Sequence, residues 1–139
     1  MLKLTHPTVD IAIVCNNFEE SLHFYHQCLG FEMVMDIRIP AEVAKGAKLA
    51  PRGFRQVRLQ AGNTLIKLID IELPPEPIFN EFNPGVRWLT VFVEDVHETV
   101  RVLKQSGVTF LAEPIAAPDA AGVVCAEDPD GVLIEFVQV

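Results

Sequence analysis

One stretch of the sequence concentrates positive charge in a way that could attract an anion. Residues 38–58 contain a single acidic side chain, Glu42, and six cations: Arg38, Lys45, Lys48, Arg52, Arg55 and Arg58. Toward its end, Gln56 and Arg58 alternate with apolar residues, so both should point to one face of a strand. The stretch is either a solvated charged loop or an electropositive rim that steers a carboxylate, phosphate or similar anion to a site.

The remainder of the chain is acidic, because the formal net charge of the 139 residues is −8. Nucleic-acid binding depends on Lys and Arg that neutralise phosphates, so we expect no nucleic-acid partner. Half of the residues are hydrophobic, which excludes a disordered chain. No apolar run approaches the roughly 20 residues of a membrane helix, and the first residues lack a signal-peptide pattern, so we expect no membrane association.

The three cysteines predict a reduced, cytoplasmic protein. Cys15, Cys28 and Cys125 are an odd number without the spacing of a metal site. Cys28 and Cys125 have apolar neighbours, which favours burial of both thiols. The sequence also lacks a phosphate-binding loop, a dinucleotide fingerprint and a nucleophile–base pairing, since its glycines are typical of turns.

The elements that would carry these residues occur twice. In the first copy the strand Val9–Val14 leads to a helix that has the capping pair Asn17 and Glu20 and ends at Gly30. The second copy has the same order, with Val86–Val93, then Asp95 with Glu98, then Gly107. This order of signals indicates an internal repeat.

Three further strands follow each helix. In the first copy they are Phe31–Ile39, Phe54–Gln60 and Thr64–Ile71, and in the second Val108–Ala112, Gly122–Ala126 and Val132–Val139. Residues 39–53 are too long for a tight turn and predict a mobile loop or a short helix. We therefore expect a single domain, 1–139, made of two βαβββ modules, about 7–72 and 85–139, with a proline-rich linker over 73–84.

Two fragments stand in a recognisable order along the chain. NFEESLHFY begins at Asn17 and leads to LGF, which ends at Phe31, and DPDGVLIE covers Asp128–Glu135. With the repeat between them, these fragments resemble the vicinal oxygen chelate (VOC) superfamily of glyoxalase I, bleomycin-resistance proteins and extradiol dioxygenases. The resemblance covers nearly the whole chain. It implies an α+β fold in which paired βαβββ modules form a curled mixed sheet, a cup around a small-molecule site.

In the metal-dependent members that this chain resembles, four cup-facing positions hold a divalent cation. Here those positions are Asp10, Lys67, Trp88 and Glu135. A charged lysine has no lone pair and an indole offers no ligand atom, so the two carboxylates would leave a poor site. We expect no metal and no other cofactor, and a divalent metal in this degraded site is the alternative.

Lys67 would then replace the metal, between the carboxylates of Asp10 and Glu135. Lys67 and Glu135 could form an ion pair that only fills the vacated site beside Trp88. Alternatively, Lys67 binds an anionic substrate or moves a proton, with Glu135 or Asp10 as its partner, so these three residues are the catalytic candidates. The alternation of the strands and the resemblance add the substrate-binding candidates, which are Trp88, Arg58, Gln56, Thr90 and Phe92.

These observations leave several functions open. We predict a protein that binds a small, anionic organic molecule in a cup-shaped site without the usual metal. The alternatives are a metal-dependent enzyme of the lyase, isomerase or dioxygenase kind, and a drug-sequestering resistance protein without turnover. We expect a homodimer, because the apolar strands Leu65–Ile71 and Leu133–Val139 could form a dimer interface. A further possibility is that the domain only pairs with a partner and binds no ligand.

Overall fold

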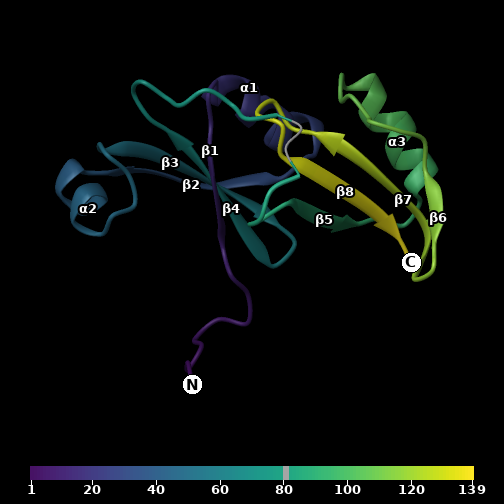
Figure 1. Ribbon diagram of the computed structural model, residues 1–139, viewed down its shortest axis with the longest axis horizontal. Coiled ribbons are helices and arrows are strands. Elements are labelled where there is room, and N and C mark those ends of the chain that lie inside the picture. The colour runs from purple at the N-terminus through teal and green to yellow at the C-terminus, as the bar shows by residue number, and fades with distance from the viewer. Residues whose placement is uncertain (80–81) are drawn as a thin grey trace. The chain divides into compact units, whose positions relative to one another are not determined.

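The chain folds into two compact units, Met1–Glu76 and Pro77–Val139 (Figure 1). The computed structural model describes residues 1–79 and 82–139. Each unit holds one mixed four-stranded sheet, as the α+β prediction with two βαβββ modules requires. The boundary between the units lies within the predicted linker 73–84, of which residues 80 and 81 lie outside the described part.

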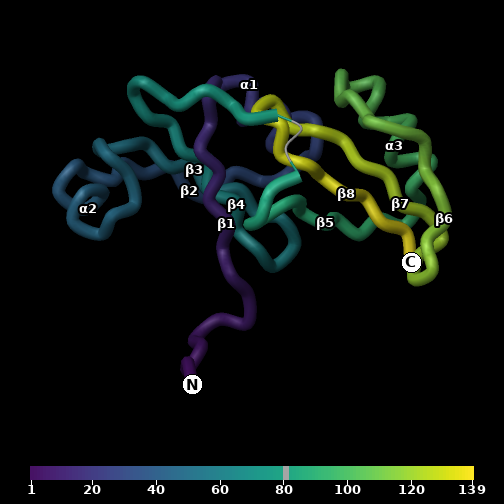
Figure 2. Tube along the Cα trace, in the orientation of Figure 1, coloured from purple at the N-terminus to yellow at the C-terminus, as the bar shows by residue number. Residues whose placement is uncertain are grey.

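The sheet of the first unit has the strand order β1-β4-β3-β2. Its strands are β1 (Ile11–Val14), β2 (Glu32–Ile39), β3 (Phe54–Ala61) and β4 (Thr64–Asp70). β1 is parallel to β4, and the other pairs are antiparallel. Residues ahead of β1 extend away from this sheet as an arm (Figure 2). Along the chain, one strand, a helix and three further strands follow one another as predicted.

The helix after β1 begins as predicted and then changes its winding. The Asn17 side chain accepts a hydrogen bond from the Glu20 backbone N–H and caps α1 (Phe18–Leu22). The chain continues as the π-helix η1 (His23–Cys28), where the Leu29 N–H reaches the Phe24 carbonyl five residues earlier. The wider turn buries Phe24 and Tyr25 and leaves Leu29 half-buried, which regular helical spacing does not predict.

The two faces of the first sheet are used differently. Buried apolar side chains, among them Ile13, Val57 and Leu68, lie on the face that α1 covers. Alternation places Lys67 and Arg58 on the opposite face. At one end of that opposite face, α2 (Ala41–Gly46) closes a small core made of Ala44, Phe54, Ile69 and Ile71. The predicted loop or short helix over 39–53 thus contains a short helix.

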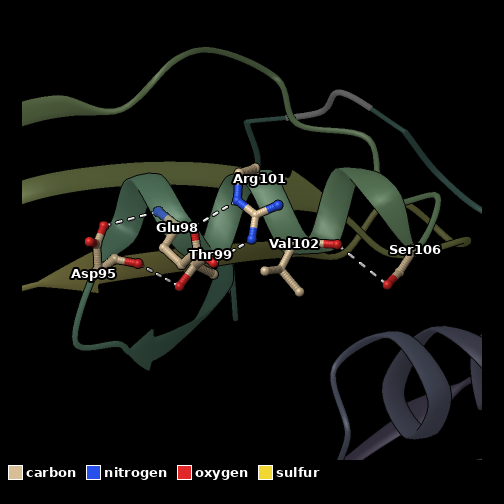
Figure 3. Close-up of polar contacts among 6 residues, drawn as sticks. All are labelled: Asp95, Glu98, Thr99, Arg101, Val102 and Ser106. Carbon is tan, nitrogen blue, oxygen red and sulfur yellow. Dashed lines mark hydrogen bonds and ion pairs between the residues drawn. The ribbon is translucent and has the colours of Figure 1, made fainter.

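The second unit repeats this plan with the strand order β5-β8-β7-β6. Its elements are β5 (Trp88–Phe92), α3 (Val96–Gln105), β6 (Ile115–Ala117), β7 (Ala120–Glu127) and β8 (Leu133–Gln138). Asp95 caps α3 by accepting a hydrogen bond from the Glu98 N–H, and Thr99 donates to the Asp95 carbonyl (Figure 3). The predicted cap and the Gly107 stop, at φ 93°, are confirmed.

One predicted strand is wrong. Val108–Ala112 forms no strand, since Phe110 makes only an isolated bridge to Ala126. The strand that pairs with β7 on the side away from β8 is β6, a few residues later and beyond Pro114. Residues 111 and 112 form a bend, and Pro114 has no N–H to donate to a ladder. Apolar content alone therefore misplaced the second strand of this module.

The cysteines differ from prediction as well. Cys15 is the buried thiol, at 1% exposure, whereas Cys28 and Cys125 are only half-buried. In the described part of the chain, the three cysteines form no disulfide. For Cys125 in β7, sequence neighbours point alternately to the two faces of the strand, so they do not report which face the cysteine occupies. Cys28 ends the π-helix η1, whose winding the sequence neighbours do not reveal. No helix in the described part of the chain is long and apolar enough to cross a membrane.

Candidate functional site

The face of the first sheet opposite α1 carries two cations on adjacent strands. Lys67 of β4 and Arg58 of β3 are directly opposite in the antiparallel register, so their side chains project from the same face. The Lys67 Nζ lies 3.2 Å from a carboxylate oxygen of Asp10. We call the set Asp10, Gln56, Arg58 and Lys67 the Lys67 face. Its charges sum to an excess of one cation.

Arg58 is held by its neighbour on the same strand. Its Nε donates a hydrogen bond of 2.7 Å to the Gln56 Oε1, and Gln56 is only 8% exposed. Within the described residues Arg58 takes part in no ion pair, so its terminal N–H groups can serve an anion. The predicted pairing of Gln56 and Arg58 on one face is confirmed by the register.

The second sheet has a comparable face on β5 and β8, which we call the Glu135 face: Trp88, Thr90, Phe92 and Glu135. The Trp88 Nε1 donates to the Thr90 Oγ1 over 3.1 Å, and the Thr90 hydroxyl donates to the Glu135 Oε1 over 2.8 Å. Thr90 and Glu135 are register partners of the parallel pair. Trp88 and Phe92 flank Thr90 on the same face and are 49% and 70% exposed.

Cys125 lies beside Glu135 in the next strand, where the two are register partners. Burial raises the pKa of the Cys125 thiol, the Glu135 carboxylate raises it further, and Arg87 opposes both. No pattern in the sequence connects Cys125 with Glu135. Only the register of β7 against β8 brings them together.

The predicted electropositive rim is divided by the fold. The Arg55 guanidinium pairs with Asp36 through two hydrogen bonds of 2.9 and 2.8 Å and lies 4.8 Å from the centre of the Phe18 ring. The Asp36 carboxylate raises the pKa of Arg55, and Arg55 lowers the pKa of Asp36. Arg38 is the register partner of Arg55 and shares its face. These cations lie on the side opposite Lys67.

Arg52 and the two lysines have other positions. Arg52 donates hydrogen bonds to the backbone carbonyls of Glu72 and Leu73, which ties the chain after β4 to the loop after α2. Lys45 and Lys48 border a surface depression of about 460 Å³ with Leu49, Ala50 and Pro51. The six cations therefore form separate groups rather than one rim, which corrects the sequence-based interpretation.

One of the two predicted partners of Lys67 lies in its own unit, and there Lys67 forms an ion pair with Asp10. Glu135 belongs to the other unit, where it accepts a hydrogen bond from Thr90. The catalytic roles of Asp10, Lys67 and Glu135 remain predictions.

The chain belongs to the Glyoxalase/Bleomycin resistance protein/Dioxygenase superfamily, whose family model matches residues 5–136. The uncharacterized protein YwkD of Bacillus subtilis is 27% identical, over 99% of this chain and 98% of that protein.

Solved structures share the fold at low sequence identity. A glyoxalase family protein from Bacillus cereus superposes with a TM-score of 0.79 at 17% identity, over 99% of this chain and 95% of that one. TnmS3, an antibiotic binding protein from Streptomyces sp. CB03234, has a TM-score of 0.69 at 20% identity, over 99% and 98%. A superfamily member from Sphaerobacter thermophilus has a TM-score of 0.65 at 25% identity, over 99% and 98%.

The residues at the family's metal positions do not fit a metal. The Lys67 ammonium is a donor and already neutralises Asp10, and the Trp88 indole donates its only N–H to Thr90. Two of the four positions therefore supply no lone pair to a cation. In the described residues, no group of three or more His, Cys, Asp and Glu side chains could hold a metal ion.

Proposed function

We propose that this protein binds a small organic anion in the cup that the family resemblance predicts, and that it does so without the family's usual metal. The Lys67 face would receive the anionic group. The observation that carries this proposal is the pairing of Arg58 with Lys67, two like charges directly opposite each other on neighbouring strands.

Like charges directly opposite each other on neighbouring strands destabilise a sheet. Asp10 compensates only one of the two cations. A bound carboxylate or phosphate would compensate the other, and the Arg58 guanidinium is suited to it because its N–H groups match the spacing of two anionic oxygens. The uncompensated positive charge and the geometry of the Arg58 donors therefore both favour a carboxylate or a phosphate as the ligand group.

The exposed aromatic rings of the Glu135 face favour an organic ligand. The faces of Trp88 and Phe92, which are 49% and 70% exposed, offer stacking surfaces for a flat group. These rings also favour a second candidate, sequestration of a drug or metabolite without turnover. One structural neighbour, TnmS3, is an antibiotic binding protein.

Calorimetric titration with aromatic and aliphatic carboxylates at low ionic strength tests the proposal. We expect Arg58→Gln to weaken binding about tenfold, because a hydrogen bond to a charged group contributes about 1.5–3 kcal/mol. Arg38→Gln is the matched control, since it removes the same charge from the opposite face of the same sheet. Equal weakening by both variants would show a general charge effect and would refute the Lys67 face as the site.

The metal-free part of the proposal has its own test. Native mass spectrometry of protein purified without chelator, and again after addition of Ni²⁺, Zn²⁺, Mn²⁺ or Fe²⁺, should show no stoichiometric metal. Retention that is lost in Asp10→Ala or Glu135→Ala would restore the metal-dependent alternative. The same spectra measure the mass of the assembly and so test the expected homodimer.

A further inference from the structure

The hydrogen bonds of the Glu135 face run in one direction only. An indole N–H can donate but cannot accept, so Thr90 Oγ1 is the acceptor in its bond with Trp88. A threonine hydroxyl has a single proton, which is directed to the Glu135 Oε1, 2.8 Å away. Glu135 therefore receives a hydrogen bond from this chain of groups and gives none to it.

The Glu135 carboxylate is left with acceptor capacity. A carboxylate has about four lone-pair positions on two oxygens, and Thr90 uses one of them. In the part of the chain that the structure describes, no ion pair includes Glu135. Its side chain is half-buried on a sheet face next to the exposed Trp88 ring.

We infer that Trp88 and Thr90 hold Glu135 as an acceptor for a hydrogen-bond donor of the ligand, so that the ligand carries a hydroxyl or ammonium group beside a flat or apolar part. Thr90 is then a positioning residue that acts through Glu135. This inference rests on the proposed function and adds a hydrogen-bond donor to the ligand that the Glu135 face would receive. A carboxylate positioned to accept a hydrogen bond favours a ligand that has a donor over an analogue that lacks one.

The chain of hydrogen bonds can be tested without any ligand. Trp88 is the only tryptophan, so the protein has one indole N–H resonance in a ¹H–¹⁵N spectrum. Thr90→Val removes the hydroxyl and keeps a β-branched side chain, and we expect the indole resonance to move upfield. Thr90→Ser keeps the hydroxyl and should leave the resonance near its wild-type position. An unchanged resonance in Thr90→Val would overturn the inference.

Ligand selection is tested with 4-hydroxybenzoate and 4-methoxybenzoate, two anions that differ in the donor. We expect the wild-type protein to prefer the hydroxyl compound about tenfold, equivalent to about 1.4 kcal/mol. Thr90→Val and Glu135→Gln should reduce this preference, and Thr90→Ser should retain it. Equal affinities of the two compounds for the wild-type protein would refute the inferred role of Glu135.

The outcomes separate this inference from the proposal beneath it. If neither benzoate nor any other carboxylate binds, the proposed function fails, and the indole resonance still decides whether Thr90 links Trp88 to Glu135. If both benzoates bind equally and Arg58→Gln weakens both, the anion site stands and the donor-specific role of Glu135 is wrong.

Discussion

The ring of Phe79 lies against Gly131 so closely that a Cβ at position 131 would be 2.5 Å from the Phe79 Cδ1. Gly131 belongs to the turn between β7 and β8 and has a φ of 85°. The turn is further held by Asp128, whose side chain accepts from the N–H groups of Asp130 and Val132. The segment that follows the boundary between the units is thus packed onto the turn that leads to Glu135.

We predict that Gly131→Ala destabilises the protein by about 2–3 kcal/mol, from left-handed backbone strain and the contact with Phe79. Gly107→Ala is the control, because Gly107 has a φ of 93° and a Cβ added there would meet no atom within 4 Å. It should cost only the strain, about 1–2 kcal/mol. Urea unfolding followed by Trp88 fluorescence measures both. Equal losses would show that Phe79 does not oppose a side chain at position 131.

Removal of the Asp10 charge should strengthen the binding of an organic anion. Asp10 neutralises Lys67, so Asp10→Asn releases a cation on the Lys67 face. An exposed ion pair contributes about 0.2–1 kcal/mol, which corresponds to an increase in affinity of up to about fivefold. Titration of 4-hydroxybenzoate measures it, with Asp119→Asn as a control for net charge. A weaker complex in Asp10→Asn would mean that Asp10 itself contacts the ligand.

The ion pair of Asp36 with Arg55 should make stability depend on acid pH. Arg55 lowers the pKa of Asp36 from its ordinary value of 3.8 in the folded protein. The pair therefore contributes fully above that ordinary value, and its contribution is lost as the pH falls through the lowered pKa. Asp36→Asn should melt below the wild-type protein near pH 7, and the difference should close in acid as the pH falls through the lowered pKa of Asp36. A difference that persists in acid would assign the loss to packing.

Glu135 should slow the alkylation of Cys125. Burial and the neighbouring carboxylate both raise the pKa of the Cys125 thiol, so less thiolate is present at a given pH. Glu135→Gln removes the second cause and should speed the reaction with iodoacetamide, measured by peptide mass spectrometry. Cys28 is an internal reference, because burial alone raises the pKa of its thiol. An equal change at Cys28 would point to a general loosening of the fold.

Local signals in the sequence predicted the repeated plan of the fold well. A capping side chain bonds a backbone N–H only three residues away, as Asn17 and Asp95 do, so its pattern is readable without any tertiary contact. The strand at Val108–Ala112 failed because an apolar run does not report whether a neighbouring strand pairs with it. The π-helix His23–Cys28 was missed because helical spacing alone does not reveal the wider winding.

The candidate site was only partly predictable for the same reason. Alternation along a strand is local, and it correctly placed Arg58 with Gln56, and Trp88 with Thr90 and Phe92, on shared faces. Whether a cation already has a partner depends on residues distant in the sequence. Arg52 donates to the carbonyl of Glu72 beyond β4, and Arg55 pairs with Asp36 of the neighbouring strand. The sequence alone therefore could not show that these two arginines are not part of an anion-binding rim.

The sequence by itself determined the family, the order of the elements and the residue types at each candidate position, including the lysine and tryptophan at positions where the resemblance implies metal ligands. Only the tertiary structure decided the partners of those residues. Lys67 pairs with Asp10, and Trp88 reaches Glu135 through Thr90, because strands distant in sequence align in one register. The register decides which groups meet, and the donor chemistry of the indole and the hydroxyl then decides the direction of the hydrogen bonds.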